Sequence, residues 1–366
     1  MLIGIFGAGQ LGRMLALAGI PLGMRFRFLD PHETPCAAEL GEHIRAPFDD
    51  ENAIEQFVIG LDAVTIEFEN IPPRALDIAA RSVTVQPSAR SLDTAKDRQN
   101  EKALFERCGI PYARTASVSS AEDFACAIDR IGTPGILKSR SDGYDGKGQT
   151  RVESATEARP AYDSIGPVPA VYEQFIEFDH ECSIVAARST TGETAFYPLT
   201  INTHTRGILT KSVVPAEPHP LTDLAKAHAT AILNDLQHVG VLAVEFFVKG
   251  GSLIANEIAP RVHNTGHWTI DAARTSQFEN HLRAILGLPL GPTDLTDPHG
   301  CAMLNLIGGL PDLADTLKFS RTRVHHYGKL PKLGRKVGHI TWVGERAAGF
   351  GRLEEAVSAA NALAGT

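Results

Sequence analysis

The chain has 366 residues, of which 43% are hydrophobic and 21% are charged, and its formal net charge is -8. This length exceeds the size at which one hydrophobic core usually stops growing, so we expect two or three domains. The composition is that of a globular enzyme, and the negative charge argues against a nucleic-acid-binding surface.

The first ninety or so residues predict a small parallel sheet. Its strands are expected over residues 2–6, 25–29, 63–68 and 83–86. Residues 10–17 are expected to form the beginning of a helix. Two further helices are expected over residues 73–81 and 92–108. We place the end of this N-terminal α/β domain near residue 95, which gives a first unit over residues 1–95.

The second expected unit is a compact α+β subdomain over residues 96–178. It contains a helix over 121–131, a strand over 136–138, a glycine-rich segment at 142–149 and a strand over 170–175.

The third unit, residues 179–366, has the alternation of an antiparallel sheet. Its strands are expected over residues 181–187, 194–200, 209–215, 241–249, 252–258, 303–307, 323–327 and 339–343. Long helices are expected over 221–239 and 278–286, and Gly250-Gly251 is a strong hairpin signal.

Neither the cysteines nor the apolar runs indicate export or a membrane span. Five widely spaced cysteines form no Cys-x-x-Cys pair, which favours reduced thiols over a zinc site or disulfide framework. The chain enters a strand directly after Met1, and Gly, Pro or charge interrupts every apolar run well before about 18 residues. We therefore expect a cytoplasmic protein without membrane or nucleic-acid partners.

The glycine-rich segment Asp142–Gln149 is typical of a loop that closes over a polyphosphate. Glycine lets the backbone approach a ligand closely, and Lys147, together with Lys138 on the preceding strand, supplies positive charge. A solvent-exposed hairpin is the alternative interpretation of the same glycines.

A second glycine pattern, Gly7-x-Gly9-x-x-Gly12 followed by Asp30, matches the fingerprint of dinucleotide-binding folds. A nicotinamide-dependent oxidoreductase is therefore one hypothesis. Against it, the sheet ends too early for a second mononucleotide-binding half. The turn can still bind one substrate phosphate at a helix N-terminus, or it can be purely structural.

Two lone acids lie within otherwise apolar strands. The Gly250-Gly251 turn lies about midway between Glu245 and Glu257, so the two acids should lie roughly opposite each other on adjacent strands. An unpaired buried carboxylate is costly, and a Mg²⁺ ion carrying ATP phosphates would satisfy both acids, with Asn256 close by. The alternative is that Arg or Lys bridges each acid.

Two polar stretches complete the pattern. The segment over residues 259–267 contains Arg261, His263 and Asn264, and it follows the acidic strand where a small anionic reactant would meet ATP. Lys329, Lys332, Arg335 and Lys336 form a basic cluster in an acidic chain, either a substrate-phosphate clamp or a solvated surface.

Five segments in this order resemble the ATP-grasp superfamily, and within it the N5-carboxyaminoimidazole ribonucleotide synthetase family. The segments are 7–14 (GAGQLGRM), 68–70 (FEN), 143–149 (GYDGKGQ), 256–267 (NEIAPRVHNTGH) and 334–339 (GRKVGH). The resemblance covers nearly the whole chain. It implies an ATP-grasp fold with an N-terminal parallel-sheet domain, a small lid subdomain and a C-terminal antiparallel-sheet domain.

The resemblance also implies a role for each matched residue. ATP would be bound by Arg98, Lys138, Gly143, Tyr144, Asp145, Gly146, Lys147, Gly148, Gln149, Glu173, Gln174, Phe175, Ile176, Glu181, His204, Asn256 and Glu257. The ribonucleotide would contact Gln10, Leu11, Glu69, Tyr144, Asp145, Lys329, Arg335 and Lys336. Magnesium, or manganese in its place, would be held by Glu245 and Glu257. The catalytic residues would be Arg261, His263, Asn264 and Lys147.

The implied reaction is ATP-dependent carboxylation of 5-aminoimidazole ribonucleotide with bicarbonate, through carboxyphosphate, in purine biosynthesis. The resemblance further implies a homodimer built on the C-terminal region. Another ATP-grasp ligase, such as a formyl-transferring ribonucleotide enzyme or a biotin carboxylase, is the alternative within the fold. The nicotinamide-dependent oxidoreductase is the alternative outside it.

Overall fold

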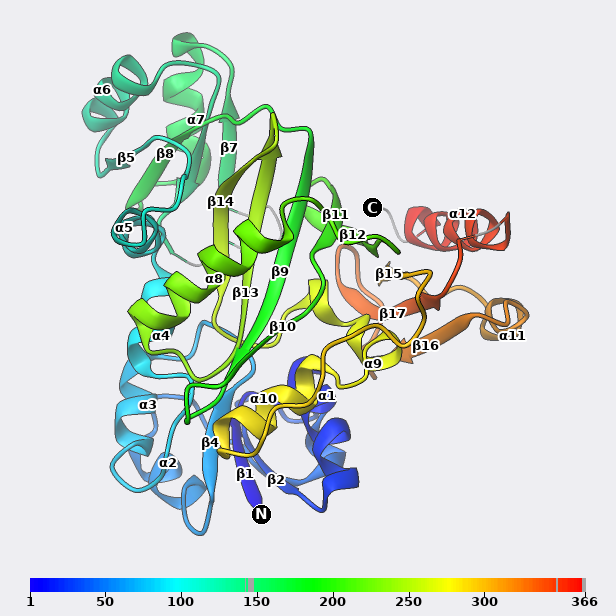
Figure 1. Ribbon diagram of the computed structural model, residues 1–366. Helices are drawn as coiled ribbons and strands as arrows, with labels where there is room; N and C mark the ends of the chain where they lie inside the picture. Colours follow the sequence, from blue (N-terminus) through cyan, green and yellow to red (C-terminus); the bar gives the residue numbers. More distant parts are fainter. Residues whose placement is uncertain (142, 144–147, 347, 364–366) are drawn as a thin grey trace.

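The computed structural model describes residues 1–141, 143, 148–346 and 348–363. Three sheets organise these residues. Figure 1 shows a small sheet at the bottom, another at the upper left, and the long strands of the large sheet between them. The described helices include none that is both long and apolar enough to cross a membrane.

The N-terminal sheet is parallel throughout, with strand order β3-β2-β1-β4. Its elements are β1 (Leu2–Phe6), α1 (Gln10–Gly19), β2 (Arg25–Leu29), β3 (Glu42–Ile44), α2 (Glu51–Phe57), β4 (Ala63–Ile66) and α3 (Pro73–Ala79). The predicted strand over residues 83–86 is wrong, because only an isolated bridge joins Val85 to Val64. The sheet thus ends at four strands, without the second half that a dinucleotide-binding fold needs.

The predicted single helix over residues 92–108 is two helices, α4 (Ala89–Lys96) and α5 (Arg98–Arg107). Asp97 between them is extended, and its side chain accepts a hydrogen bond from Gln99 N at 2.9 Å, which caps α5. Arg140 Nε also donates to this carboxylate at 2.7 Å. The break is therefore held in part by a residue 43 positions further along the chain.

The small sheet is antiparallel, with strand order β5-β8-β6-β7. Its elements are β5 (Thr115–Val118), α6 (Ala121–Ile131), β6 (Gly135–Ser139), β7 (Gln149–Val152), α7 (Ala158–Ile165) and β8 (Ala170–Gln174). Phe124 and Tyr172 pack edge to face with ring centroids 5.2 Å apart, within a core that both helices share with the sheet.

The large sheet has nine strands among the described residues, in the order β14-β13-β9-β11-β12-β15-β17-β16, with β10 paired to β9. The strands are β9 (His180–Arg188), β10 (Thr194–Phe196), β11 (Thr200–Thr205), β12 (Ile208–Val214), β13 (Gly240–Lys249), β14 (Ser252–Ala259), β15 (Cys301–Ile307), β16 (Thr322–His326) and β17 (Lys336–Val343). The helices are α8 (Thr222–Leu236), α9 (Thr269–Ala272), α10 (Gln277–Ile285), α11 (Leu313–Leu317) and α12 (Ala348–Leu363). The predicted strand over 194–200 is wrong in its extent, since β10 ends at Phe196 and Thr200 begins the next strand.

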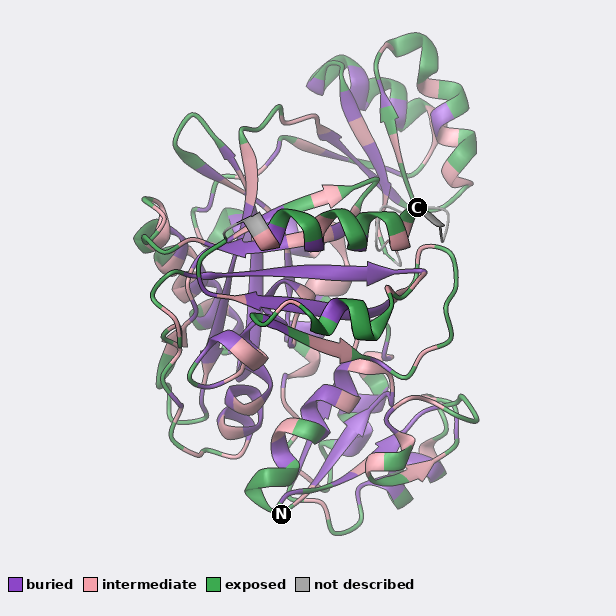
Figure 2. Cartoon of the chain, turned by 90° about the vertical axis from the view of Figure 1, so that its right-hand side faces the viewer, coloured by how far each residue is buried: buried purple, intermediate pink, exposed green. Residues whose placement is uncertain are grey.

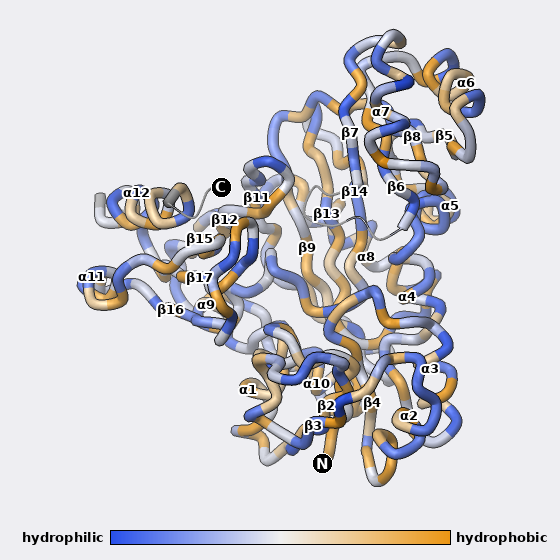
Figure 3. The backbone as a smooth tube through the Cα atoms, turned by 180° about the vertical axis from the view of Figure 1, so that it is seen from behind, coloured by the Kyte–Doolittle hydropathy of each residue, from blue (hydrophilic) through white to orange (hydrophobic). Residues whose placement is uncertain are grey.

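The central strands are buried and the helices lie outside them. Figure 2 shows the long strands coloured as buried, whereas the helices expose their outer faces. Figure 3 shows apolar residues along β9 and β13 and a mixture of polar and apolar residues on the helices. This distribution is that of a sheet core covered by amphipathic helices.

One hydrophobic core joins the N-terminal sheet to the large sheet. It contains Leu15 of α1, Val241 of β13 and Leu282 of α10. A buried hydrogen bond of 2.7 Å between Thr65 Oγ1 and His281 Nε2 crosses the same junction. Each sheet lies within one of the three expected domains, and the boundaries at residues 95 and 178 stay a prediction.

Candidate functional site

Glu245 and Glu257 lie directly opposite each other. The antiparallel register of β13 and β14 pairs them, next to a bulge between Glu245 and Phe246. Directly opposed residues of an antiparallel pair point to the same face, so the two carboxylates share one side of the sheet. This confirms the opposition that the spacing around the Gly250-Gly251 turn predicts.

Negative charge is in excess at this acid pair. Burial and the neighbouring Glu257 raise the pKa of Glu245 to about 7, although His204 and Lys336 act in the opposite direction. Arg98 Nη1 lies 3.8 Å from Glu257 Oε2, and His263 Nε2 lies 3.7 Å from Glu245 Oε1. These distances exceed those of hydrogen bonds, so Arg98 compensates Glu257 only in part. Burial lowers the pKa of His263 well below its ordinary value, so this ring is neutral and brings no charge to Glu245.

Glu173, in contrast, lies between two buried lysines. Lys138 Nζ donates to Glu173 Oε2 at 2.6 Å, and Lys102 Nζ lies 3.4 Å from Glu173 Oε1. Burial opposes ionisation here, but the two lysines overcome it and hold the pKa of Glu173 at about 2. Lys102 also donates to the backbone oxygen of Asn256 at 2.6 Å, which ties α5 to the acidic strand β14.

The glycine-rich segment connects β6 to β7, which form an antiparallel hairpin. Gln149 pairs with Lys138, and Ser139 N donates to the Gly148 carbonyl at 2.7 Å. Gly148 has a φ of +69°, which favours glycine. The described ends of the segment thus belong to the two paired strands of a hairpin, next to the buried Lys138. Asp142, Tyr144, Asp145, Gly146 and Lys147 lie outside the described residues.

Two further predicted ATP contacts meet on neighbouring strands of the large sheet. His204 Nδ1 lies 2.8 Å from Glu181 Oε2. Burial opposes the charge of His204, but the bond to Glu181 raises its pKa. The predicted adenine-binding stretch from Glu173 to Ile176 lies at the end of β8 and just beyond it, where the polypeptide leaves the small sheet.

The glycine turn before α1 is filled by the chain's own acids. Glu67 accepts hydrogen bonds from Gly9 N at 2.6 Å and from Gly12 N at 2.8 Å, and Asp30 accepts one from Ala8 N at 2.9 Å. A Cβ on Gly9 would lie 2.6 Å from Glu67 Oε1. Glycine is therefore needed at this position to make room for a carboxylate of the same chain.

The turn and the basic cluster lie close together. Lys329 interacts electrostatically with Glu67 below the turn, and burial lowers the pKa of Lys329. Gln10 and Leu11 open α1 at the same place. Of the other basic residues, Lys336 is close enough to Glu245 to influence its pKa, whereas Arg335 is exposed.

The structure joins a predicted substrate contact to a predicted catalytic residue. Arg261 Nη2 lies 2.7 Å from Glu69 Oε1 in the N-terminal domain. Gln277 fixes the backbone of His263 from both sides, because its Oε1 accepts from His263 N at 3.0 Å and its Nε2 donates to His263 O at 2.6 Å. Asn264 is held by a reciprocal amide pair with Asn305.

Sequence reasoning missed several residues that shape this site, including Glu67, Lys102 and Tyr327. Glu67 ends an apolar strand, and Lys102 lies on the inner face of an otherwise amphipathic helix. A charged residue on an apolar face is the signal that would have identified both. Tyr327 has no comparable local signal.

Consecutive parts of the chain match three family descriptions. They are a ribonucleotide synthetase preATP-grasp domain over residues 1–96, an ATP-grasp domain over residues 103–278 and a phosphoribosylaminoimidazole carboxylase C-terminal domain over residues 301–351. The glycine turn thus lies in a ribonucleotide synthetase domain and not in a nicotinamide-binding one.

Relatives match nearly the full length. N5-carboxyaminoimidazole ribonucleotide synthase of Pseudomonas aeruginosa is 50% identical over 341 residues, which cover 93% of this chain and 94% of that protein. The crystal structure of N5-carboxyaminoimidazole ribonucleotide synthetase from Thermus thermophilus has a TM-score of 0.89 and 46% identity, covering 97% of this chain and 96% of that one. An Aspergillus clavatus structure, in complex with ADP and 5-aminoimidazole ribonucleotide, has a TM-score of 0.90 and 28% identity and covers 98% of each chain.

These likenesses confirm the expected ATP-grasp fold, with its parallel N-terminal sheet and its large antiparallel C-terminal sheet. They extend over all three sheets, and the identity is high enough to show more than a shared fold. The chain belongs to the N5-carboxyaminoimidazole ribonucleotide synthase family of ATP-grasp ligases.

Proposed function

We propose that this chain uses ATP and bicarbonate to convert 5-aminoimidazole ribonucleotide to N5-carboxyaminoimidazole ribonucleotide, ADP and phosphate, in purine biosynthesis. The observation that carries the proposal is the pairing of Glu245 with Glu257 across β13 and β14. Family membership and the complexes named above support ATP and the ribonucleotide as substrates.

The acid pair fits a magnesium ion. Both side chains offer hard oxygen donors and they share one face of the sheet. Burial, and after it the repulsion of Glu257, raises the pKa of Glu245, and a cation between the two acids would relieve both effects. Manganese would suit the same donors. When bound, the ion would polarise and orient the terminal phosphates of ATP.

The small sheet and the large sheet would hold the nucleotide between them. Lys138 and Arg98 bring positive charge to the phosphates from β6 and α5. Gly143, Gly148 and Gln149 would cover the same phosphates, together with residues 144–147. The backbone of residues 173–176 would bind adenine, Glu181 and His204 would contact the ribose, and Asn256 would lie beside the metal-binding acids.

Bicarbonate is a poor electrophile, so it needs activation before it can react with a weakly basic amine. Arg261 and His263 would hold bicarbonate so that its oxygen attacks the γ-phosphorus in line, while the bond to the β–γ bridging oxygen of ATP breaks. Arg98 and Lys138 would stabilise the charge that develops on the phosphoryl oxygens. The products of this step are carboxyphosphate and ADP.

Carboxyphosphate then divides into CO₂ and phosphate, and the exocyclic amine of the ribonucleotide bonds to the carbon of CO₂. The amine loses one proton, for which the departing phosphate is a competent acceptor. Asn264 and Lys147 would orient the reactants. Glu69, Gln10 and Leu11 would position the ribonucleotide, together with Tyr144 and Asp145, and Lys329, Arg335 and Lys336 would clamp its phosphate.

One assay separates this proposal from its alternatives. ATP hydrolysis is measured with bicarbonate in the presence of aminoimidazole ribonucleotide, formate or biotin, beside a nicotinamide-binding titration. The proposal predicts turnover that depends strictly on bicarbonate and the ribonucleotide. Turnover with formate or biotin in place of the ribonucleotide would contradict it.

We also infer a homodimer that uses the C-terminal region, in a cytoplasmic protein. Exposed Leu313 and Leu317 of α11, with exposed Leu310 just before it, support such an interface. Light scattering after size exclusion measures the mass directly, and a monomer at micromolar concentration would contradict the dimer.

A further inference from the structure

A buried hydroxyl joins the loop over residues 261–267 to the C-terminal strands. Tyr327 Oη lies 2.9 Å from His267 Nδ1 and 2.8 Å from His339 Nδ1. All three side chains are almost completely buried. Tyr327 follows β16 directly, and its backbone N–H donates to the Val337 carbonyl of β17 at 3.0 Å.

The surrounding hydrogen bonds define the direction of each donor. Asn305 Nδ2 donates to the Leu209 carbonyl at 2.8 Å and to Asn264 Oδ1 at 2.7 Å, which orients both amides. Asn264 Nδ2 then donates to His267 Nδ1 at 3.0 Å, so this ring nitrogen carries no proton.

Because His267 Nδ1 carries no proton, the Tyr327 hydroxyl must donate to it, sharing its one lone pair with Asn264 Nδ2, and it accepts from His339 Nδ1. Burial lowers the pKa of both histidines well below the ordinary value, so each ring is neutral. Burial also raises the pKa of Tyr327, which keeps its proton. The result is a directed chain of neutral hydrogen bonds from the strands to the loop.

Each end of this series of hydrogen bonds lies next to residues that would take part in the proposed reaction. Asn264 belongs to the same short loop as Arg261, which would act on bicarbonate. Tyr327 precedes Lys329 by two positions in the sequence, and Lys329 would bind the ribonucleotide phosphate. Beside the amide pair of Asn264 with Asn305, the hydroxyl is thus a second polar link between the loop and the C-terminal strands.

We propose that Tyr327 is a positioning residue whose hydroxyl holds the ribonucleotide clamp of the C-terminal strands in register with the bicarbonate-activating loop. This inference rests on the proposed function. CO₂ released at the loop must meet an amine that the clamp places, and a loosened link leaves CO₂ to escape. ATP would then be hydrolysed without carboxylation.

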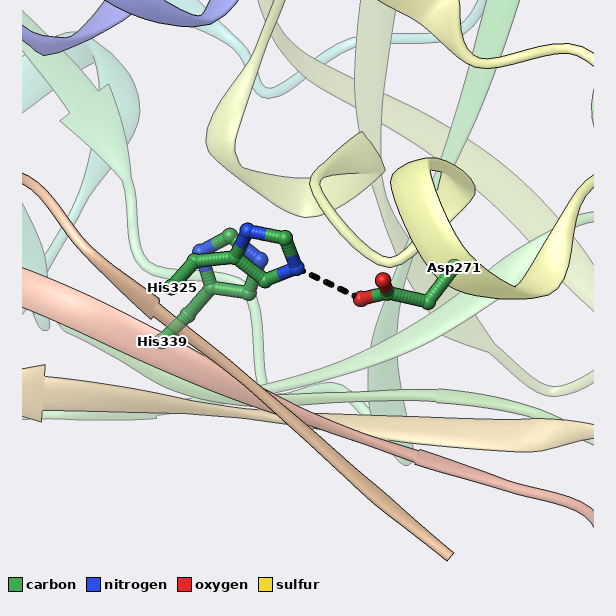
Figure 4. A group of neighbouring side chains, drawn as sticks. All are labelled: Asp271, His325 and His339. Carbon is green, nitrogen blue, oxygen red and sulfur yellow. Dashed lines mark hydrogen bonds and ion pairs between the residues drawn. The ribbon is translucent and has the colours of Figure 1, made fainter. Parts of the chain in front are cut away.

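The neighbouring group of Asp271, His325 and His339 strengthens the link and does not form a metal cradle. Potential ligand atoms of the three residues lie within 4.8 Å of one another. Figure 4 shows, however, that the two rings lie face to face, and their planes differ by 15° with centroids 4.5 Å apart. Their in-plane lone pairs therefore run side by side instead of converging on one ion. Asp271 Oδ2 bonds to His325 Nε2 at 2.8 Å, which fixes the ring that packs on His339.

The test is Tyr327→Phe in the full-length protein, with product and ADP measured in the same reaction. We expect the product formed per ATP hydrolysed to fall about tenfold, because small displacements of reacting groups cost rate steeply. The KM for ATP should stay unchanged, because the ATP-binding residues lie on other strands. A role in stability alone would not alter the ratio of product to ADP.

Tyr197→Phe is the matched control. The Tyr197 hydroxyl is equally buried and also makes two hydrogen bonds, to the Thr275 carbonyl at 3.0 Å and from Asn280 Nδ2 at 2.8 Å. Its loss should cost similar stability and leave the ratio of product to ADP at the wild-type value.

Three results would overturn the inference: a folded Tyr327→Phe variant with wild-type coupling, equal uncoupling in Tyr197→Phe, or stoichiometric Zn²⁺ binding that His325→Ala abolishes. If Tyr327→Phe does not fold, His325→Ala decides, since His325 is partly exposed and supports His339. That variant should be uncoupled in the same direction, and full coupling would count against the proposal. A wild-type protein without ribonucleotide-dependent turnover would instead contradict the proposed function.

Discussion

Two acidic groups in the proposed ATP site carry their charge in opposite ways. Glu173 is compensated by Lys102 and Lys138, and its pKa is held at about 2. Glu245 lies opposite a second carboxylate, and its pKa is raised to about 7. The first group is complete within the folded chain, whereas the second has a surplus of negative charge that a cation from solution can neutralise. The fold itself thus supplies the positive charge for Glu173, whereas the pair of Glu245 and Glu257 lacks a cation at hydrogen-bond distance among the described residues.

The largest expected effect is that of Glu257→Gln on turnover. The amide keeps the shape of the side chain but removes the charge of a metal ligand, so we expect kcat to fall about a thousandfold. The free energy of unfolding should not fall, because the change removes one of two repelling acids. Steady-state kinetics and urea unfolding measure both quantities.

Glu106→Gln is the control for this variant, because Glu106 is exposed on α5. It should keep wild-type kcat. Turnover of Glu257→Gln within a few-fold of the wild type would show that the acid pair does not act as proposed.

In the compensated group around Glu173, the substitution Lys102→Met should mainly lower the free energy of unfolding. It leaves Glu173 with one lysine and frees the Asn256 carbonyl, and breaking a buried ion pair costs about 3 kcal/mol. The free energy of unfolding from urea titration is the measurement.

Lys211→Met provides the comparison, since Lys211 forms a partly exposed ion pair with Glu354. Such pairs contribute less than about 1 kcal/mol. Equal losses in the two variants would mean that the lysines around Glu173 have no special role.

A substitution in the basic cluster should have a smaller effect, limited to the KM for the ribonucleotide. Arg335→Ala should raise the KM for the ribonucleotide about tenfold, as expected for the loss of one charge-assisted phosphate contact, and should leave the KM for ATP unchanged. Lys332→Ala removes the same charge from the same exposed stretch, and it should have little effect on either KM. An effect of Arg335→Ala confined to ATP would argue against the clamp.

The smallest effect concerns a buried group that stays neutral. His281 Nδ1 accepts a hydrogen bond from Val241 N, its Nε2 donates to Thr65 Oγ1, and burial lowers its pKa to about 3. In the unfolded chain this histidine has a pKa of about 6.5, so it binds a proton more readily there than in the folded protein. The contribution of His281 to the free energy of unfolding is therefore fully present above that pH and is lost as the pH falls.

Between about pH 7.5 and about pH 5.5, His281 should therefore account for a loss of about 1.4 kcal/mol. His281→Gln removes the group that binds this proton. Over the same pH interval, the free energy of unfolding of the variant should therefore fall by about 1.4 kcal/mol less than that of the wild type. Identical pH dependence in the two proteins would contradict the neutral assignment.

Local patterns in the sequence predicted the elements on which the site rests. The Gly250-Gly251 turn defined the hairpin, and counting outward from it placed Glu245 roughly opposite Glu257. A regular register would pair Glu245 with Asn256, and the bulge between Glu245 and Phe246, which the sequence did not predict, shifts the partner to Glu257. The βαβ unit at the N-terminus was equally local.

Features that depend on distant partners were not predicted. The break at Asp97 relies on Arg140 just beyond β6, and the glycine turn before α1 is filled by Glu67 from the end of β4. The hydrogen bond between Tyr327 and His267 joins residues separated by 60 positions. No window of sequence contains both partners of these contacts, so periodicity and propensity carry no information about them.

The central claim is that Glu245 and Glu257 together hold the divalent ion that carries ATP. Electron paramagnetic resonance of Mn²⁺ tests it directly, with a non-hydrolysable ATP analogue bound to the wild-type protein and to Glu257→Gln. The account predicts that the wild type binds Mn²⁺ with the nucleotide and that the variant loses the ion while it still binds the nucleotide. Equal Mn²⁺ affinity in the two proteins would contradict it.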